Sequence, residues 1–130
     1  MAIVLTYGTF DLLHVGHVNL LRRARELGDR LVVGLSSDRF NALKNKSSTQ
    51  GYADRAAVLR AIRYVDEVFP EDTWEQKAHD IRRYGADILV MGSDWAGHFD
   101  DLARHCTVRY LPRTEDISSS LLKASIRAMQ

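Results

Sequence analysis

The sequence AIVLTYGTFDLLHVGH occupies residues 2–17 and joins two different patterns. Its first part, Ala2–Tyr7, is continuously apolar rather than alternating, which is typical of a strand covered on both faces of its sheet. A helical period follows from about Val15 to Leu27, and Gly28 supplies a stop signal. A buried strand that leads directly into a helix indicates one β–α unit of a parallel sheet.

The alternation of strand and helix continues along the chain. Further strands are predicted at residues 31–35, 65–69, 87–91 and 107–111. Helices are predicted at residues 53–62, at 73–84 with a capping-box spacing at its start, and after Ser118. We therefore expect one doubly wound α/β domain over residues 1–130, with a five-stranded parallel sheet and helices on both faces. Such sheets bind ligands beyond the carboxyl ends of their strands.

Composition limits the class of protein. The chain has 130 residues, of which 45% are hydrophobic and 27% charged, as in ordinary globular domains. Its net charge of +1 gives no field to gather a polyanion, so no nucleic-acid partner is expected. A single cysteine, Cys106, suits a reducing compartment, and the apolar opening is too short for a membrane span. We expect a cytoplasmic protein without membrane insertion.

Two histidines follow the first strand at a spacing that places both on one side of a helix's first turn. His14 and His17 flank Gly16, which allows a ligand to approach closely. Free N–H groups and the positive end of the helix dipole favour phosphate at this point. A zinc site would need a third protein ligand, and no spacing nominates one, so no metal ligand is predicted.

A polar loop forms the other informative segment. Residues 43–52, LKNKSSTQGY, carry Lys44 and Lys46. The loop is either a solvated connector or a cationic segment that closes over phosphates beside the crevice.

Several motifs carry a family resemblance. Residues 7–17 resemble the H-x-G-H signature of the nucleotidyltransferase superfamily, and residues 113–119, RTEDISS, resemble the R-T-E-G-I-S-T motif of its cytidylyltransferase branch. Residues 62–68, 74–77 and 91–95 extend the similarity over essentially the whole chain, which resembles the bacterial glycerol-3-phosphate cytidylyltransferases of this branch. The resemblance implies transfer of a cytidylyl group from CTP to glycerol 3-phosphate, with release of pyrophosphate. CDP-glycerol, a precursor of teichoic acids, would be the product, Mg²⁺ would accompany CTP, and the protein would be a homodimer.

The resemblance also implies residue roles. His14, His17 and Arg113 would act on the triphosphate and the transition state. The nucleotide would be bound by Gly8, Thr9, Phe10, Asp11, Gly16, Lys46, Asp94, Thr114, Ile117, Ser118, Ser119 and Ser120. The acceptor phosphate would be bound by Lys44, Arg63 and Lys77.

Structural alternatives stay open for some of these residues. The three serines would also cap the last helix, Asp94 and Lys77 would also suit a solvated surface, and Arg63 would also pair with Asp66 or Glu67.

The chain departs from the motif at Asp116, where the family has glycine. A carboxylate that faces a triphosphate is unfavourable, so we expect Asp116 to turn to solvent or to pair with Arg113 or Lys123.

Two other functions compete with cytidylyl transfer. One is an adenylyltransferase of the same superfamily that resembles FAD synthase, and the other is a nucleotide-binding module without turnover.

Overall fold

The computed structural model describes residues 1–114 and 118–129. The strands are β1 (Ile3–Gly8), β2 (Arg30–Ser36), β3 (Glu67–Glu71), β4 (Ile88–Gly92) and β5 (Thr107–Leu111). The α-helices are α1 (Val15–Glu26), α2 (Asp38–Leu43), α3 (Tyr52–Arg60), α4 (Gln76–Tyr84) and α5 (Ser119–Ala128), and two 3₁₀ helices, η1 (Ser93–Trp95) and η2 (Asp100–Arg104), precede β5. All strand pairs are parallel, in the order β3-β2-β1-β4-β5. The predicted doubly wound parallel sheet is confirmed.

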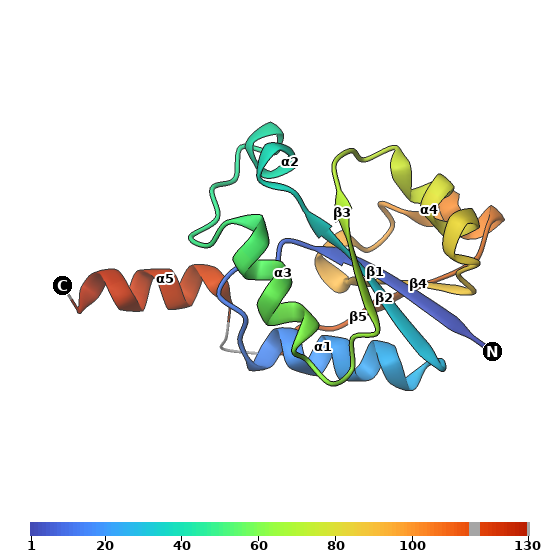
Figure 1. Ribbon diagram of the computed structural model, residues 1–130, viewed down its shortest axis with the longest axis horizontal. Coiled ribbons are helices and arrows are strands. Elements are labelled where there is room, and N and C mark those ends of the chain that lie inside the picture. Colours follow the sequence, from blue (N-terminus) through green and yellow to red (C-terminus); the bar gives the residue numbers. More distant parts are fainter. Residues whose placement is uncertain (115–117, 130) are drawn as a thin grey trace.

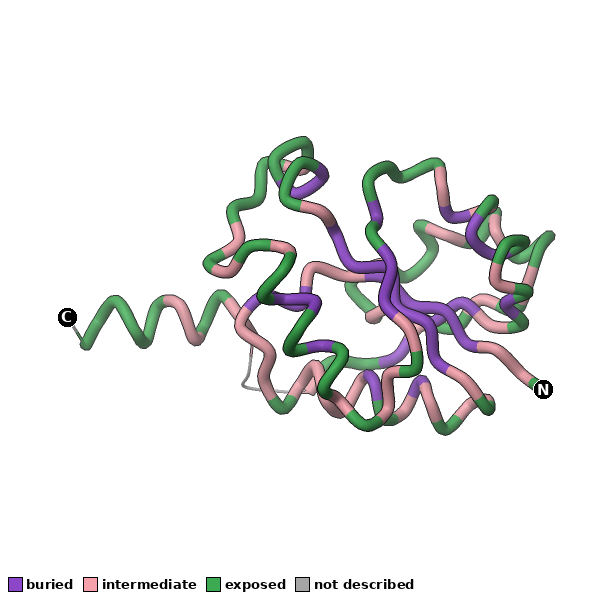
Figure 2. The backbone as a smooth tube through the Cα atoms, in the orientation of Figure 1, coloured by how far each residue is buried: buried purple, intermediate pink, exposed green. Residues whose placement is uncertain are grey.

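The sheet is covered on both faces, as Figure 1 shows, with α1 and α3 on one side and α4 with residues 93–106 on the other. Because neighbouring side chains of a strand point to opposite faces, Val4 packs beneath α1 and α3 while Leu5 packs beneath α4. Both side chains are fully buried, and Figure 2 shows burial concentrated along the strands. This two-sided burial explains why the first strand is continuously apolar.

The strand order reverses at β1. The chain runs outward from β1 to β2 and β3, and then returns to place β4 on the other side of β1. The carboxyl ends of β1 and β4 therefore lie side by side, and the segments that follow them form a crevice at one edge of the sheet.

Two element predictions differ from the structure. The helix predicted from Thr73 begins at Gln76, with Glu75 as its N-cap. The Gln76 half of the predicted capping box is present, because Gln76 Oε1 accepts the N–H of Thr73 at 3.1 Å, and it also accepts the N–H of Asp72 at 2.7 Å. Helix α2 was not predicted: it has six residues, with Ser37 as its N-cap, and is too short to show a helical period.

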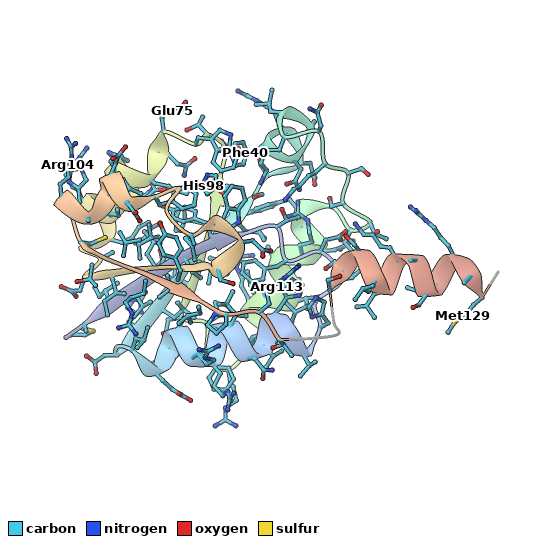
Figure 3. All side chains as sticks on the ribbon, turned by 180° about the vertical axis from the view of Figure 1, so that it is seen from behind. Phe40, Glu75, His98, Arg104, Arg113 and Met129 are labelled. Atoms are coloured by element: carbon cyan, nitrogen blue, oxygen red, sulfur yellow. The ribbon has the colours of Figure 1, made fainter. Side chains whose placement is uncertain are left out.

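Helix α5 projects from the body of the molecule (Figures 1 and 3), and Met129 lies near its far end. Within residues 119–128 no side chain is buried. Among the described helices, none is both long and apolar enough to cross a membrane.

Candidate active site

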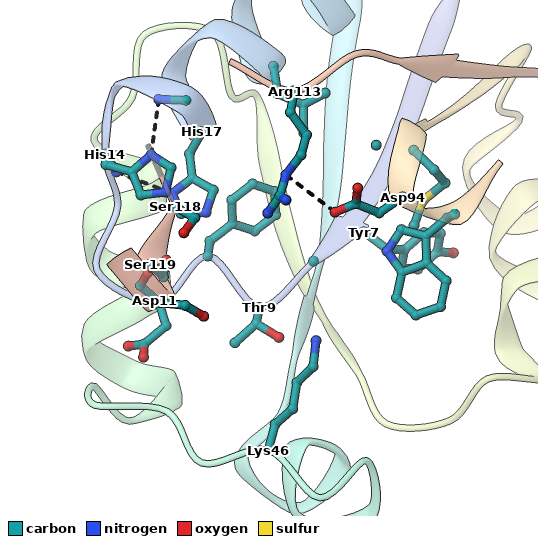
Figure 4. A pocket seen from close by; sticks show the side chains of 18 of the residues that line it. Tyr7, Thr9, Asp11, His14, His17, Lys46, Asp94, Arg113, Ser118 and Ser119 are labelled. Carbon is teal, nitrogen blue, oxygen red and sulfur yellow. Dashed lines mark hydrogen bonds and ion pairs between the residues drawn. The ribbon is translucent and has the colours of Figure 1, made fainter. Parts of the chain in front are cut away.

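A cavity of about 530 Å³ lies at the crevice edge of the sheet (Figure 4). It brings together residues from β1, the loops after β1, β4 and β5, the segment after α2, and the starts of α1, α4 and α5. The predicted site residues that line it are Gly8, Thr9, Phe10, Asp11, His14, Gly16, His17, Lys44, Lys46, Lys77, Asp94, Arg113, Thr114, Ser118, Ser119 and Ser120. Segments that are more than 100 residues apart in the sequence thus share one cavity.

Arg63, which the resemblance assigned to the acceptor phosphate, does not line this cavity. It lies between the end of α3 and the start of β3, at the amino edge of the sheet and opposite to the crevice. Its guanidinium lies 5.4 Å from the ring centroid of Tyr64. The predicted ion pairs of Arg63 are absent from the described residues too, because Asp66 pairs with Arg25 and Glu67 with Arg30. Ile117 and Asp116 lie outside the described residues.

The loop after β1 has an unusual backbone. Phe10 and Leu12 have φ angles of 49° and 51°, in the left-handed region that non-glycine residues rarely adopt. The Phe10 ring covers Gly8 so closely that a Cβ on Gly8 would lie 2.7 Å from it, so only glycine fits there. Left-handed conformations of this kind cost about 1–3 kcal/mol each and concentrate at functional sites.

The two imidazoles hold each other in place at the start of α1. Nδ1 of His14 accepts the Gly16 N–H at 3.0 Å, and Nδ1 of His17 accepts the His14 N–H at 3.2 Å. The rings stack with centroids 3.9 Å apart. Because both Nδ1 atoms accept hydrogen bonds, the proton of each neutral ring lies on Nε2. The backbone N–H groups of His14 and Gly16 therefore donate to the imidazoles and are not free for phosphate, which corrects that expectation.

The electrostatics keep both histidines neutral. Burial, followed by the neighbouring His14, lowers the pKa of His17 to about 4. Burial and the charge of Arg113 lower the pKa of His14 as well. At neutral pH the pair therefore offers two Nε2–H donors without a positive charge of its own.

Arg113 and Lys46 reach the cavity from opposite sides (Figure 4). Arg113 follows β5, and its Nε lies 3.3 Å from Oδ2 of Asp94, which follows β4. Both side chains are largely exposed, so this ion pair is weak and leaves the guanidinium available to an anion. The neighbouring Thr114 is fixed to α1 by a 3.0 Å hydrogen bond from Asn19.

Asp11 belongs to the loop after β1 and is only 5% exposed. Its carboxylate accepts the N–H groups of Thr49 and Gln50 at 2.7 and 3.0 Å, and Nζ of Lys123 lies 2.8 Å from it. Burial alone would raise the pKa of Asp11, but the hydrogen bonds from Lys123, Thr49 and Gln50 lower that pKa overall. Asp11 is therefore ionised, and its hydrogen bonds and ion pair connect the loop after β1 to residues 49 and 50 and to Lys123 of α5.

Two lysines, Lys44 and Lys77, form a second group of donors in the cavity. The first group consists of His14, His17, Arg113 and Lys46. Lys77 is 2% exposed, so a solvated surface position is wrong for it, and its Nζ lies 2.5 Å from Glu71 Oε2. Its ammonium also lies 4.8 Å from the Trp74 ring centroid. Lys44 donates to Ser36 Oγ at 3.0 Å, and burial lowers its pKa to about 8. Burial raises the pKa of Glu71, although Lys77 opposes that effect.

Three charged residues were missed: Glu71 and Lys123 line the cavity, and Arg55 supports it from α3. Glu71 ends β3 and lines the cavity, but the predicted strand stopped at Phe69. Arg55 is buried on α3 and donates to the carbonyl oxygens of Thr9, Ser36 and Gln50 at 2.8–2.9 Å. The sequence did offer a signal for Arg55, because this arginine lies on the apolar side of the predicted helix 53–62.

The carboxylates among the described lining residues each have a cationic neighbour: Asp11 has Lys123, Glu71 has Lys77 and Asp94 has Arg113. Within residues 1–114 and 118–129, no group of three or more His, Cys, Asp or Glu side chains is arranged to hold a metal ion. The cavity is thus an anion site, with imidazole, guanidinium and ammonium donors.

A doubly wound parallel sheet with paired histidines and cations around its crevice defines an α/β protein that binds nucleotide phosphates. Residues 5–125 match the model of the family described as "Cytidylyltransferase-like". The chain belongs to this family and is a nucleotidyltransferase, as the sequence motifs predicted.

Individual relatives agree with this assignment. The chain is 54% identical over 126 residues to "Glycerol-3-phosphate cytidylyltransferase" of Bacillus subtilis (strain 168), covering 97% of this chain and 98% of the relative. It is 53% identical over 123 residues to the protein of the same name from Staphylococcus aureus (strain NCTC 8325 / PS 47), covering 95% and 93%. A "lipopolysaccharide core biosynthesis protein" from Thermoplasma volcanium GSS1 has the same fold, with a TM-score of 0.74 and 21% identity, covering 88% of this chain and 99% of that one.

Proposed function

We propose that the protein transfers the cytidylyl group of CTP to glycerol 3-phosphate, giving CDP-glycerol and pyrophosphate. The observation that carries this proposal is the presence of two cationic clusters in one cavity. His14, His17, Arg113 and Lys46 suit a triphosphate, and Lys44 with Lys77 suits the phosphate of an acceptor. The names of the two bacterial relatives, which match nearly the full chain, support the same substrates.

In the proposed reaction an oxygen of the acceptor phosphate attacks the α-phosphorus of CTP. A new P–O bond forms as the bond from the α-phosphorus to the oxygen that bridges it to the β-phosphorus breaks, and that oxygen leaves with its electron pair as part of pyrophosphate. The nucleophile is already an anion, so no proton has to be removed from it. The protein's task is to position the two anions and to stabilise charge on the phosphoryl oxygens.

Each group has a role that its geometry supports. The Nε2–H groups of His14 and His17 donate to oxygens of the reacting phosphate without requiring an imidazolium. Arg113, largely exposed at the rim, binds the β- and γ-phosphates that depart together. Lys44 and Lys77 neutralise the acceptor, and Glu71 keeps Lys77 in place.

We propose that Mg²⁺ enters with CTP. Each carboxylate among the described lining residues lies beside a cation, so phosphate oxygens and water are the natural ligands for the ion. When bound, Mg²⁺ neutralises charge on the triphosphate.

We also propose that the protein is a cytoplasmic homodimer. The single cysteine suits a reducing compartment, and the family resemblance is the basis for the dimer.

Pyrophosphate release tests the proposed function. The purified protein would be assayed with CTP or ATP, each combined with glycerol 3-phosphate, with other small phosphorylated alcohols or with FMN. We expect kcat/KM for CTP with glycerol 3-phosphate to exceed every other pair at least tenfold. A preference for ATP with FMN would favour an adenylyltransferase that resembles FAD synthase. If the protein binds nucleotide but releases no pyrophosphate with any pair of substrates, it would instead be a nucleotide-binding module without turnover.

A further inference from the structure

One carboxylate joins three separate segments of the site. Lys123 on α5 reaches Oδ2 of Asp11 at 2.8 Å and the carbonyl oxygen of Ser47 at 3.4 Å. The same carboxylate accepts the N–H groups of Thr49 and Gln50. The loop after β1, the segment 44–51 and the first turns of α5 therefore meet at Asp11.

Helix α5 has little else to fix its position. No side chain of residues 119–128 is buried, and the helix extends away from the sheet (Figures 1 and 2). Its apolar residues Leu122 and Ile126 line an open groove with Leu12 and Val58 rather than a closed core. The polar contacts at its start therefore carry most of the attachment.

Two contacts act together at that start. Besides the ion pair of Lys123, the hydroxyl of Ser119 donates to the main-chain oxygen of Asp11 at 2.5 Å. Ser118 caps the helix by accepting the N–H of Leu121 at 3.1 Å, and Ser118 and Ser119 both line the cavity. The position of Lys123 thus determines where these serines face the cavity.

The ion pair also has an electrostatic effect. Asp11 is an ionised side chain that lines a cavity built for anions, and Lys123, which also lines the cavity, places its ammonium 2.8 Å from this carboxylate. Loss of the ammonium would leave a buried negative charge that repels a triphosphate.

We propose that Lys123 is a positioning residue for the nucleotide half of the site, acting through Asp11 to hold the start of α5 and the segment 44–51 against the β1 loop. Its effect on CTP rests on the proposed function. Lys44 is anchored separately, by its hydrogen bond to Ser36, so Lys123 influences CTP binding much more than acceptor binding.

The experiment compares Lys123→Met and Lys123→Arg with Arg127→Met, a control that removes an exposed cation from the far end of the same helix. Amide hydrogen exchange of the ligand-free protein reports the attachment itself. We expect Lys123→Met to accelerate exchange at least tenfold in residues 44–51 and 118–124, with Lys123→Arg and Arg127→Met close to wild type. Unchanged exchange in Lys123→Met would overturn the proposal.

Steady-state kinetics report the consequence for the site. We expect Lys123→Met to raise the CTP KM at least tenfold and the acceptor KM less than twofold, with substantial rescue in Lys123→Arg. In an Asp11→Asn background the effect of Lys123→Met on the CTP KM should shrink below threefold, because the charge through which Lys123 acts is gone. An active wild type with an unchanged CTP KM in Lys123→Met, or an undiminished effect beside Asp11→Asn, would contradict the positioning role. Failure of the wild type to release pyrophosphate would instead refute the proposed function, and hydrogen exchange would still decide whether Lys123 holds the segments together.

Discussion

His14 and His17 each present a single Nε2–H group toward the cavity, because their Nδ1 atoms accept backbone hydrogen bonds. We predict that His14→Ala and His17→Ala each lower kcat by about 10²–10³, which is the usual effect of removing one preorganised donor to a transition state. The CTP KM should change much less. Steady-state kinetics of the folded variants would measure both constants, with Val15→Ala as the control because this exposed residue lies between the histidines. Near-normal turnover in either histidine variant would remove the proposed role.

Lys44 gives the reaction a pH dependence on the alkaline side. Burial disfavours the charged amine and lowers the pKa of Lys44 to about 8, so the positive charge is present below pH 8 and is lost as the pH rises through it. The phosphate of the acceptor has a second pKa of about 6, so it stays a dianion as the pH rises from about 7 through 8. We predict that kcat/KM for the acceptor falls above about pH 8, and that Lys44→Arg removes this decline because arginine stays protonated. The same decline in Lys44→Arg would exclude Lys44 as its source.

The two cationic clusters should separate kinetically. We predict that Lys77→Met raises the acceptor KM more than the CTP KM, and that Lys46→Met does the reverse, because Lys77 is buried beside Glu71 whereas Lys46 is exposed and reaches the cavity opposite Arg113. Lys77→Met also leaves Glu71 as a buried unpaired charge, so it should be combined with Glu71→Gln to preserve folding. Equal effects of the Lys77 and Lys46 variants on both KM values would argue against two subsites.

At the scale of the elements, α3 supports the site through Arg55. Its guanidinium bonds three carbonyl oxygens and Oδ1 of Asp38, and thereby joins the ends of β1 and β2 to the segment before α3. We predict that Arg55→Met lowers the free energy of unfolding by about 3 kcal/mol, because several buried carbonyl groups lose their donors. Urea denaturation would measure this loss against Arg60→Met, an exposed change at the end of the same helix. Equal stability of the two variants would show that water replaces the guanidinium at no cost.

The elements also show what the sequence reveals. Continuous apolar runs predicted β1, β2 and β4, because both faces of the sheet are buried there. The weaker pattern at residues 65–69 located β3 two residues too early. The two histidines were singled out because they follow the first strand at a helical spacing, whereas Asp94 and Arg113 were assigned through the family resemblance; all four line the cavity. Helix α2 is too short to show a helical period, and the start of α4 accompanies local hydrogen bonds of the Gln76 side chain. The role of Arg55 depends on contacts with distant segments, which no local period records. The position of Arg63 away from this cavity was not foreseen, because motif similarity does not tell which edge of the sheet a residue occupies.

At the scale of the whole molecule, five parallel strands bring two anion-binding clusters to one side of a protein whose net charge is only +1. The attraction for two anionic substrates is therefore local to the cavity and does not arise from the overall charge.

If this cavity joins CTP to a phosphorylated acceptor in a single displacement, both products must form together and only with that acceptor. Phosphorus NMR of the purified protein with CTP, Mg²⁺ and glycerol 3-phosphate would detect both products. We predict that pyrophosphate and CDP-glycerol appear in equal amounts, and that neither forms when glycerol replaces glycerol 3-phosphate. CTP that stays intact in the complete mixture, or pyrophosphate that appears without the phosphorylated acceptor, would rule out this reaction.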